Sequence, residues 1–177
     1  MPIIKHKDQR VAILLDVQNL YHSAKNLYKA RVNFKEIIKS ALAGRRLVRA
    51  LAYVIKTETG EEKAFFEALG KMGIETKVKD LQIFPGGMKK GDWDVGLTVD
   101  AIRLSDGSVD SIVLGTGDGD YVPLVEYLRG KGRQVEAIGF GRSTSAKLKE
   151  AVDDFIDMSD DPKRFTIPIK EGIKRNK

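Results

Sequence analysis

The sequence predicts an α/β domain with a central, mainly parallel sheet of five or six strands flanked by helices. Short runs of branched apolar residues alternate along the chain with segments of helical periodicity, which is the order that repeated strand–helix–strand units produce. At 177 residues, the chain is long enough to bury one substantial hydrophobic core. We therefore expect a three-layer arrangement within a single domain.

The expected strands are short runs of apolar and β-branched residues bounded by charged or glycine-containing segments. The first of them is apolar at five consecutive positions, which is typical of a buried strand. The strands are placed at residues 11–16, 47–55, 74–78, 111–114 and 134–138, with a shorter candidate at 155–158.

Helices are expected between these strands, and capping residues mark several of their ends. Asn33 is followed three positions later by Glu36, which is the pattern of a capping box. Gly44, Gly73 and Gly130 stand where three of the helices should end. The helices are placed at residues 20–28, 34–43, 61–72, 95–104, 121–129 and 145–152.

The domain is expected to cover residues 11–158, after a charged extension at 1–10 and before a basic, frayed tail at 159–177. No apolar run approaches the roughly 20 residues of a membrane helix, and the first ten residues lack a signal-like segment. The chain has no cysteine, which excludes disulfides and thiolate chemistry. A cytoplasmic protein without membrane association is the simplest interpretation.

Charge is distributed unevenly along the chain, whose formal net charge is +6. Residues 92–120 contain seven Asp and one basic residue, Arg103, so they carry −6 and the remainder +12. A basic body attracts RNA or DNA phosphates, whereas clustered carboxylates repel them unless a cation intervenes. Metal-dependent chemistry on nucleic acid would explain both the basic body and the acidic segment. Scattered charges on helices are, however, also typical of solvated faces.

Two of the expected strands end in acidic residues. Residues 11–15 run directly into Asp16, and residues 111–114 run into a glycine-rich segment that contains Asp118 and Asp120. The carboxyl ends of parallel strands share one edge of a sheet, and sites form where the strand order reverses. We therefore expect these carboxylates to converge at such a point.

Asp94 is a further candidate, because it should begin the helix after a basic loop and face the same cleft. Hard oxygen ligands of this kind suit Mg²⁺ or Mn²⁺. Such an ion lowers the pKa of a bound water and neutralises charge on a phosphodiester, as nucleic-acid hydrolysis requires. The candidate metal-binding and catalytic residues are Asp16, Asp94, Asp118 and Asp120.

Each carboxylate also has a structural interpretation. Asp118 and Asp120 can form a tight turn and a helix cap, and Asp92 and Asp94 can be acids favoured near a helix N-terminus. Asp16 is harder to explain in this way, because an ionised carboxylate that ends an apolar strand is costly without a partner.

Three residues are candidates for supporting the site. Asn19 either orients a metal-bound water or substrate phosphate, or caps the helix expected from residue 20. Thr116 either bonds a metal-bound water or shapes the turn after its strand. Asp100 lies about 120° around its helix from Asp94, at ~100° per residue, and is the least certain acidic member.

Nucleic-acid contacts are expected on both sides of the acidic cluster. Residues 84–91 include Lys89 and Lys90 among glycines and a proline, which predicts a mobile basic loop that either closes over a phosphate backbone or merely connects elements. Trp93 either stacks on a base or packs at a helix start. Arg142, Ser143 and Ser145 lie where a helix is expected to begin. There they either bind a phosphate or form an ordinary helix cap.

Several rival sites are disfavoured. No glycine-rich phosphate loop follows the first strand, which argues against a dinucleotide site. There is no Gly-x-Ser-x-Gly elbow, and the only histidines are His6 and His22, which argues against a Ser-His hydrolase. Gln18 stands two residues after Asp16, where phosphatases that form an aspartyl-phosphate normally carry a second Asp.

Three motifs follow one another along the chain, at residues 15–20, 90–95 with 98–101, and 116–121, and Ser145, Leu148 and 153–155 come after them. Together they resemble the motifs of NYN-domain proteins of the LabA-like group, within the PIN-like nuclease superfamily. The resemblance covers residues 11–158. In one respect the chain departs from the shorter form of the family, because two residues, Asp92 and Trp93, separate Gly91 from Asp94 where one is common.

This resemblance implies a three-layer PIN-like, Rossmannoid fold, Mg²⁺ or Mn²⁺ at the acidic cluster, and RNA as substrate. By motif, the metal would be bound by Asp16, Asp94, Asp118 and Asp120, with Asn19 and Thr116 in support and Lys90 near the substrate phosphate. Whether Asp92 or Asp94 faces the metal stays open, so Asp92 is counted among the supporting residues.

The leading hypothesis is a metal-dependent ribonuclease, an endoribonuclease, that acts on single-stranded RNA. The alternatives are an RNA-binding regulator or adaptor that has the same fold without turnover, and a phosphohydrolase of small molecules that uses the same metals. A homodimer is compatible with the sequence, since a single domain offers a shallow cleft.

Overall fold

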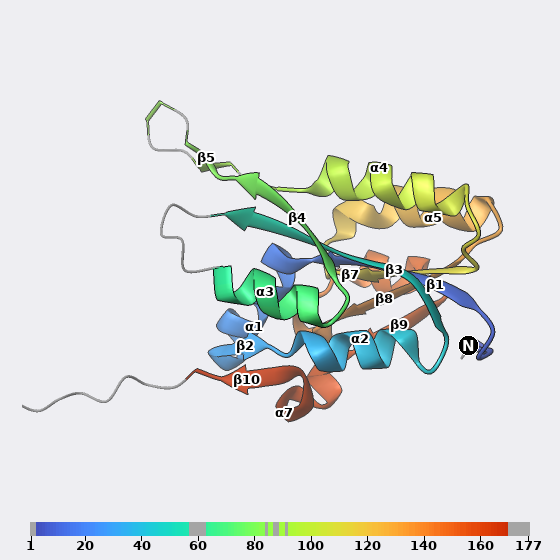
Figure 1. The fold of residues 1–177 in the computed structure, drawn as a ribbon, viewed down its shortest axis with the longest axis horizontal. Coiled ribbons are helices and arrows are strands. Elements are labelled where there is room, and N and C mark those ends of the chain that lie inside the picture. The colour runs from blue at the N-terminus through green and yellow to red at the C-terminus, as the bar shows by residue number, and fades with distance from the viewer. Residues whose placement is uncertain (1–2, 57–62, 84, 87–88, 91, 170–177) are drawn as a thin grey trace, which may run out of the picture.

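A six-stranded parallel sheet forms the centre of the protein in the computed structural model, which describes residues 3–56, 63–83, 85–86, 89–90 and 92–169. The spatial order of the strands is β4-β3-β1-β7-β8-β9 (Figure 1). The predicted mainly parallel sheet is therefore confirmed. Its strands are β1 (Arg10–Asp16), β3 (Arg46–Lys56), β4 (Glu75–Asp80), β7 (Ser111–Gly115), β8 (Gln134–Gly139) and β9 (Asp154–Asp157).

Helices cover both faces of the sheet, which gives the three expected layers (Figure 1). Residues of α1, α2 and α3 pack on one face, and residues of α4, α5 and α6 pack on the other. No helix in the described part of the chain combines the length and apolar character needed to cross a bilayer. The helices are α1 (Val17–Tyr28), α2 (Phe34–Leu42), α3 (Lys63–Lys71), α4 (Asp94–Ser105), α5 (Val122–Gly130) and α6 (Ala146–Ala151).

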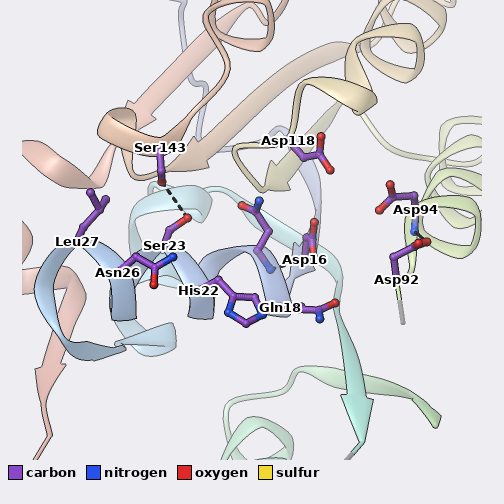
Figure 2. Close-up of a pocket in the computed structure, with 11 residues that line it drawn as sticks. Asp16, Gln18, His22, Ser23, Asn26, Leu27, Asp92, Asp94, Asp118 and Ser143 are labelled. Carbon is purple, nitrogen blue, oxygen red and sulfur yellow. Dashed lines mark hydrogen bonds between the residues drawn. The ribbon is translucent and has the colours of Figure 1, made fainter. Parts of the chain in front are cut away.

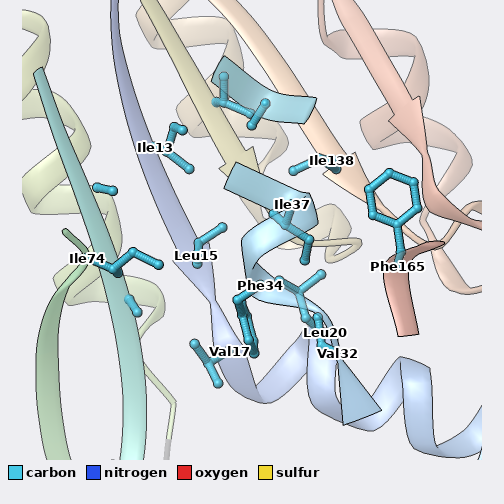
Figure 3. Packing of buried hydrophobic residues seen from close by; sticks show 14 of the residues in the cluster. Ile13, Leu15, Val17, Leu20, Val32, Phe34, Ile37, Ile74, Ile138 and Phe165 are labelled. Carbon is cyan, nitrogen blue, oxygen red and sulfur yellow. The ribbon is translucent and has the colours of Figure 1, made fainter. Parts of the chain in front are cut away.

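The central strand β1 is buried on both sides, because its side chains alternate between two hydrophobic cores. Ile13 and Leu15 pack with Leu20 of α1 and Ile37 of α2 (Figure 3). Leu14 points to the opposite face, into the core that includes α4 and α5. Burial on two sides explains why this segment of the sequence is apolar without interruption.

The strand order reverses at β1. From β1 the chain passes to β3 and β4 on one side, and later to β7, β8 and β9 on the other. In the register of the sheet, Leu15 lies between Ala52 of β3 and Gly115 of β7. The residues that follow β1 and β7 therefore meet at the topological switch point, where open α/β sheets place their ligand sites.

The segment after β9 corrects one expectation, because part of the tail predicted to be frayed is folded. The helix α7 (Pro162–Phe165) leads into β10 (Thr166–Pro168), which pairs antiparallel with β2 (Ala30–Val32). Phe165 is buried in the core on the side of α1 and α2 and anchors this segment. Residues 170–177 lie outside the described residues.

The starts of two helices differ in detail from the expectation. α1 begins three residues early, because the Asp16 carboxylate accepts a hydrogen bond from the backbone N–H of Asn19 (3.3 Å) and caps the helix. At α2, the Asn33 side chain accepts from the N–H of Glu36 as predicted. The Glu36 carboxylate does not complete the capping box, since it accepts a hydrogen bond from Arg164 at 2.8 Å.

The predicted basic loop before α4 falls only partly on described residues. β5 (Gln82–Ile83) and β6 (Lys89–Lys90) form an antiparallel pair. Residues 84, 87–88 and 91 lie outside the described part of the chain, so the mobility of this loop stays a prediction.

Candidate functional site

Asp16 is held at the switch point by two hydrogen bonds. One of its carboxylate oxygens accepts from the backbone N–H of Asn19, and the other accepts from the hydroxyl of Thr116 (3.1 Å). Thr116 follows β7 and is fully buried. The carboxylate is thus attached to both strands that meet at the switch point.

Asn19 joins α1 to the turn after β7. Its amide oxygen accepts a hydrogen bond from the backbone N–H of Gly117 (2.8 Å), so the interpretation of Asn19 as a helix cap is wrong. The Thr116 hydroxyl accepts from the N–H of Asp118 (3.2 Å), and the Asp118 carboxylate accepts from the N–H of Asp120 (2.9 Å). Asp118 therefore caps the short 3-10 turn that follows, while its side chain also belongs to the acidic cluster.

Three carboxylates gather beside Asp16. One oxygen from each of Asp94, Asp118 and Asp120 lies within 4.8 Å of the other two. The hydroxyl of Tyr121 donates a hydrogen bond to Asp94 (3.0 Å) and thereby orients the first side chain of α4. Figure 2 shows Asp16, Asp94 and Asp118 at one end of a cleft that all three line. We call the group of Asp94, Asp118 and Asp120 the carboxylate triad.

Two of these carboxyl groups hold a proton more tightly than usual. Burial raises the pKa of Asp16 to about 6, and neighbouring acidic charges add to this rise while its hydrogen bonds oppose it. Burial and the surrounding carboxylates also raise the pKa of Asp94, against the hydrogen bond from Tyr121. A bound cation would relieve the repulsion that contributes to both shifts.

The donor set fits a hard divalent cation. Mg²⁺ takes oxygen ligands at ~2.1 Å in octahedral geometry, so two ligands of one ion lie ~3.0 Å apart in adjacent positions and ~4.2 Å apart in opposite ones. One oxygen of each triad carboxylate lies within 4.8 Å of the other two, so small side-chain rotations would bring all three onto one ion. Because Mg²⁺ keeps several waters, the cleft beside the triad suits it as well.

The other two acidic candidates differ from the triad. Asp92 is exposed and lines the cleft, and its carboxylate accepts a hydrogen bond from the backbone N–H of Asp94 (3.3 Å). Asp100 accepts hydrogen bonds from the Tyr53 hydroxyl (2.7 Å) and the Lys77 ammonium (2.6 Å). Burial alone would raise the pKa of Asp100, but these two donors hold it below its usual range. Asp100 is therefore an ion-pair partner rather than a member of the cluster.

Trp93 packs within the fold, which is one of the two roles expected for it. Its indole N–H donates to the carbonyl of Val54 (2.9 Å), and its ring lies edge-on to Tyr53. The ring is partly buried against the core beneath α4, and the Lys79 ammonium lies 5.6 Å from its centroid. The indole is thus engaged within the fold rather than open to a stacked base.

The predicted phosphate-binding residues have mixed surroundings. Ser143 lines the cleft, and its hydroxyl donates to the hydroxyl of Ser23 (2.8 Å). The backbone N–H of Ser145 donates to the carbonyl of Gly117 (2.9 Å), which docks the start of α6 onto the turn after β7. Arg142 is exposed. The side chains of Lys89 and Lys90 lie outside what the structure describes.

The cleft, with a volume of about 440 Å³, extends from the acidic residues along α1 (Figure 2). Most of the residues that line the cleft along α1 were not among the site residues predicted from the sequence. Polar residues four positions apart share one face of a helix, so this spacing was the signal available in the sequence. The residues missed are Gln18, His22, Ser23, Asn26 and Leu27 along α1, and Tyr121 beside the triad.

Comparisons with known proteins agree with this architecture. The chain is 23% identical over 169 residues to the "Low amplitude and bright protein LabA" of Synechococcus elongatus, which covers 87% of this chain and 86% of that protein. The crystal structure of a protein of unknown function from Vibrio parahaemolyticus matches with a TM-score of 0.82 at 31% identity, covering 93% of this chain and 100% of that one.

The sequence profile of the NYN domain matches residues 10–160. This match extends from the first residue of β1 past the end of β9, and it includes Asp16 and the carboxylate triad. The chain therefore belongs to the NYN domain family.

Proposed function

We propose that this protein is a metal-dependent ribonuclease that hydrolyses phosphodiester bonds of RNA. The observation that carries the proposal is the carboxylate triad, whose oxygens lie within 4.8 Å of one another beside the buried carboxylate of Asp16. Like charges at this separation repel unless a ligand compensates them. The chain belongs to the NYN domain family, whose members are generally nucleases, and this supports the reaction class.

The residues of the triad would hold Mg²⁺ or Mn²⁺, and Asp16 would approach the same ion from the inner end of the cleft. When bound, such an ion supplies a water of lowered pKa and neutralises charge on the phosphodiester. The remaining polar residues position these ligands. Tyr121 orients Asp94, Thr116 orients Asp16, and Asn19 fixes the turn that carries Asp118.

RNA is proposed as the substrate because of charge and shape. Outside residues 92–120 the chain carries +12, which favours a polyanion. The exposed Arg142 adjoins the cleft residue Ser143, and it could contact a phosphate next to the one being cleaved. A cleft of about 440 Å³ accommodates an extended single strand better than the width of a duplex, which favours single-stranded RNA.

Cleavage of end-labelled and circular single-stranded RNA in Mg²⁺ or Mn²⁺ tests the proposal. The wild-type protein should produce fragments, and opening of the circular RNA would identify endonucleolytic action. Asp94→Asn and Asp118→Asn should each slow cleavage by at least about 100-fold, because each removes a charged ligand worth several kcal/mol in the transition state. Addition of EDTA should stop the reaction.

Asp8→Asn is the matched control. This variant makes the same Asp-to-Asn change far from the proposed metal site. Asp8 is exposed, precedes β1 at the opposite edge of the sheet, and pairs with Arg46. Its cleavage rate should equal that of the wild type. If the triad variants cleave as fast as this control, the catalytic assignment is wrong. If no sample cleaves RNA but all bind it, the chain is an RNA-binding protein without turnover.

A further inference from the structure

The cleft is larger than a metal site requires. Six waters around one ion occupy about 180 Å³ at ~30 Å³ each, whereas the cleft encloses about 440 Å³. The remaining volume lies along α1, away from the carboxylate triad, and is within the size range of sites for small organic ligands (Figure 2). We call this part of the cleft the α1 wall, formed by Gln18, Asn19, His22, Ser23, Asn26, Leu27 and Ser143.

The α1 wall presents an ordered row of side chains. Gln18, His22 and Asn26 recur every four residues, so they follow one another on the same face of the helix. At 1.5 Å per residue the row is about 12 Å long. Gln18 is two residues from Asp16, so the row begins at the acidic cluster and leads away from it (Figure 2).

The chemistry of this row suits a nucleobase better than a phosphate. The side-chain amides of Gln18 and Asn26 each present a donor beside an acceptor, which is the pattern needed to bond the polar edge of a base. The ring of His22 offers a flat surface, and Leu27 adds an apolar contact, both of which suit the face of a base. Among the described residues that line this wall there is no Lys or Arg.

The wall is already organised in the free protein. Ser23 is buried and accepts a hydrogen bond from Ser143, which ties α1 to the segment after β8. Asn19 is bonded to Gly117, and the ring of His22 contacts that of Tyr21 with 5.5 Å between centroids. A ligand would therefore bind without first ordering the helix, which lowers the entropic cost of association.

We propose that the α1 wall binds the base of the nucleotide next to the phosphodiester that is held at the carboxylate triad. Gln18 and Asn26 bond the edge of the base, and His22 packs against its face. The base must be unpaired, because its edge and face are both occupied by protein. This inference rests on the proposed ribonuclease function for the position of the phosphate, and it adds base selectivity.

Binding of mononucleotides compared with a sugar phosphate isolates the contribution of the base. The four nucleoside 5′-monophosphates and ribose 5-phosphate share the phosphate and ribose and differ in the base. NMR titrations of ¹⁵N-labelled protein in saturating Mg²⁺ would give the five dissociation constants. At least one nucleotide should bind about tenfold more tightly than ribose 5-phosphate, in line with the usual contribution of a stacked or bonded base.

His22→Ala and Asn26→Ala test the assignment to this wall. Both side chains are exposed, so their truncation leaves the core intact. Each variant should reduce the advantage of the preferred nucleotide to within about twofold and leave the affinity for ribose 5-phosphate unchanged. Lys25→Ala is the control, because Lys25 lies on the same helix, is exposed and does not line the cleft. The Lys25→Ala variant should bind the preferred nucleotide about tenfold more tightly than ribose 5-phosphate, as the wild type does.

The inference is overturned if ribose 5-phosphate binds as tightly as all four nucleotides, or if His22→Ala and Asn26→Ala keep the same preference as Lys25→Ala. These outcomes are distinct from failure of the ribonuclease proposal. Base-dependent binding without RNA cleavage would remove the enzymatic function and leave the base site standing. Cleavage of RNA without any base-dependent binding would remove the base site alone.

Discussion

At the scale of single residues, the charge of Asp16 at the site lowers the stability of the folded protein, because the carboxylate is buried. The residue caps α1 and accepts hydrogen bonds from Asn19 and Thr116. Asn would cap the helix as well as Asp does, because its amide oxygen accepts from the backbone N–H of Asn19, while its NH₂ group would donate to the Thr116 hydroxyl instead of accepting from it. Burial penalises only the charge of the carboxylate, so the fold gains nothing from this charge, whereas the metal site proposed above would.

Asp16→Asn should therefore stabilise the metal-free protein at neutral pH. The pKa of Asp16 is raised to about 6, above its ordinary value of 3.8, so the folded state binds a proton that the unfolded state releases. Between about pH 4 and 6 this group makes folding less favourable as pH rises, and above pH 6 the full cost is present. We expect the substitution to increase the free energy of unfolding at pH 7.5 by up to about 3 kcal/mol, at ~1.36 kcal/mol per pKa unit.

Urea denaturation in EDTA at pH 4 and pH 7.5 measures this effect. The difference between Asp16→Asn and wild type should be large at pH 7.5 and small at pH 4, where the carboxyl group is protonated in the folded state and still partly protonated in the unfolded state. Saturating Mn²⁺ should stabilise the wild type more than the variant. A variant that is less stable than wild type at pH 7.5 would contradict the assignment of Asp16 as a strained, ligand-directed carboxylate.

At the scale of elements, the site depends on how closely the turn after β7 approaches the segment after β8. A Cβ atom at Gly117 would lie 2.8 Å from the hydroxyl oxygen of Thr144 and 3.0 Å from the carbonyl oxygen of Ser143. A backbone oxygen cannot move aside as a flexible side chain can. The turn that carries Asp118 is therefore positioned by a contact that only glycine permits.

Gly117→Ala should lower the free energy of unfolding by about 1–3 kcal/mol and weaken Mn²⁺ binding, because the turn must shift and take Asp118 with it. Gly70→Ala makes the same change in α3, where the added Cβ would have no atom within 4 Å apart from its chain neighbours and the backbone of its own helix. This control should gain up to about 1 kcal/mol from helix propensity and leave Mn²⁺ affinity unchanged. Equal effects of the two substitutions on Mn²⁺ affinity would show that the contact does not position the site.

At the scale of the whole molecule, the parts that sequence predicts are those encoded by local patterns. Apolar runs located all six strands of the sheet, and an acidic residue directly after such a run located Asp16 at the switch point. The pairing of β2 with β10 was missed, because strands of three residues show no periodicity and their partners are distant in sequence. Phe165, which anchors that pairing, looks like any isolated aromatic residue in a charged segment.

The candidate site was only partly predictable for a related reason. The sequence predicted that the carboxylates lie at one edge of the sheet and that Asp100 points away from Asp94. It could not show that Tyr53 and Lys77, from the neighbouring strands β3 and β4, hold the Asp100 carboxylate. Likewise, the spacing of polar residues along α1 was visible from the start. Its relation to a cleft becomes apparent only when the helix is placed beside the ends of β1 and β7.

The most direct test of a metal site at the switch point is anomalous diffraction from crystals grown with Mn²⁺. We predict an anomalous peak about 2.1 Å from carboxylate oxygens of Asp94 and Asp118, with Asp120 and Asp16 completing the surroundings of the ion. The peak should disappear in Asp118→Asn crystals grown in the same way. A fully ordered carboxylate triad without a peak at millimolar Mn²⁺, or a peak only at other acidic residues, would contradict the assignment.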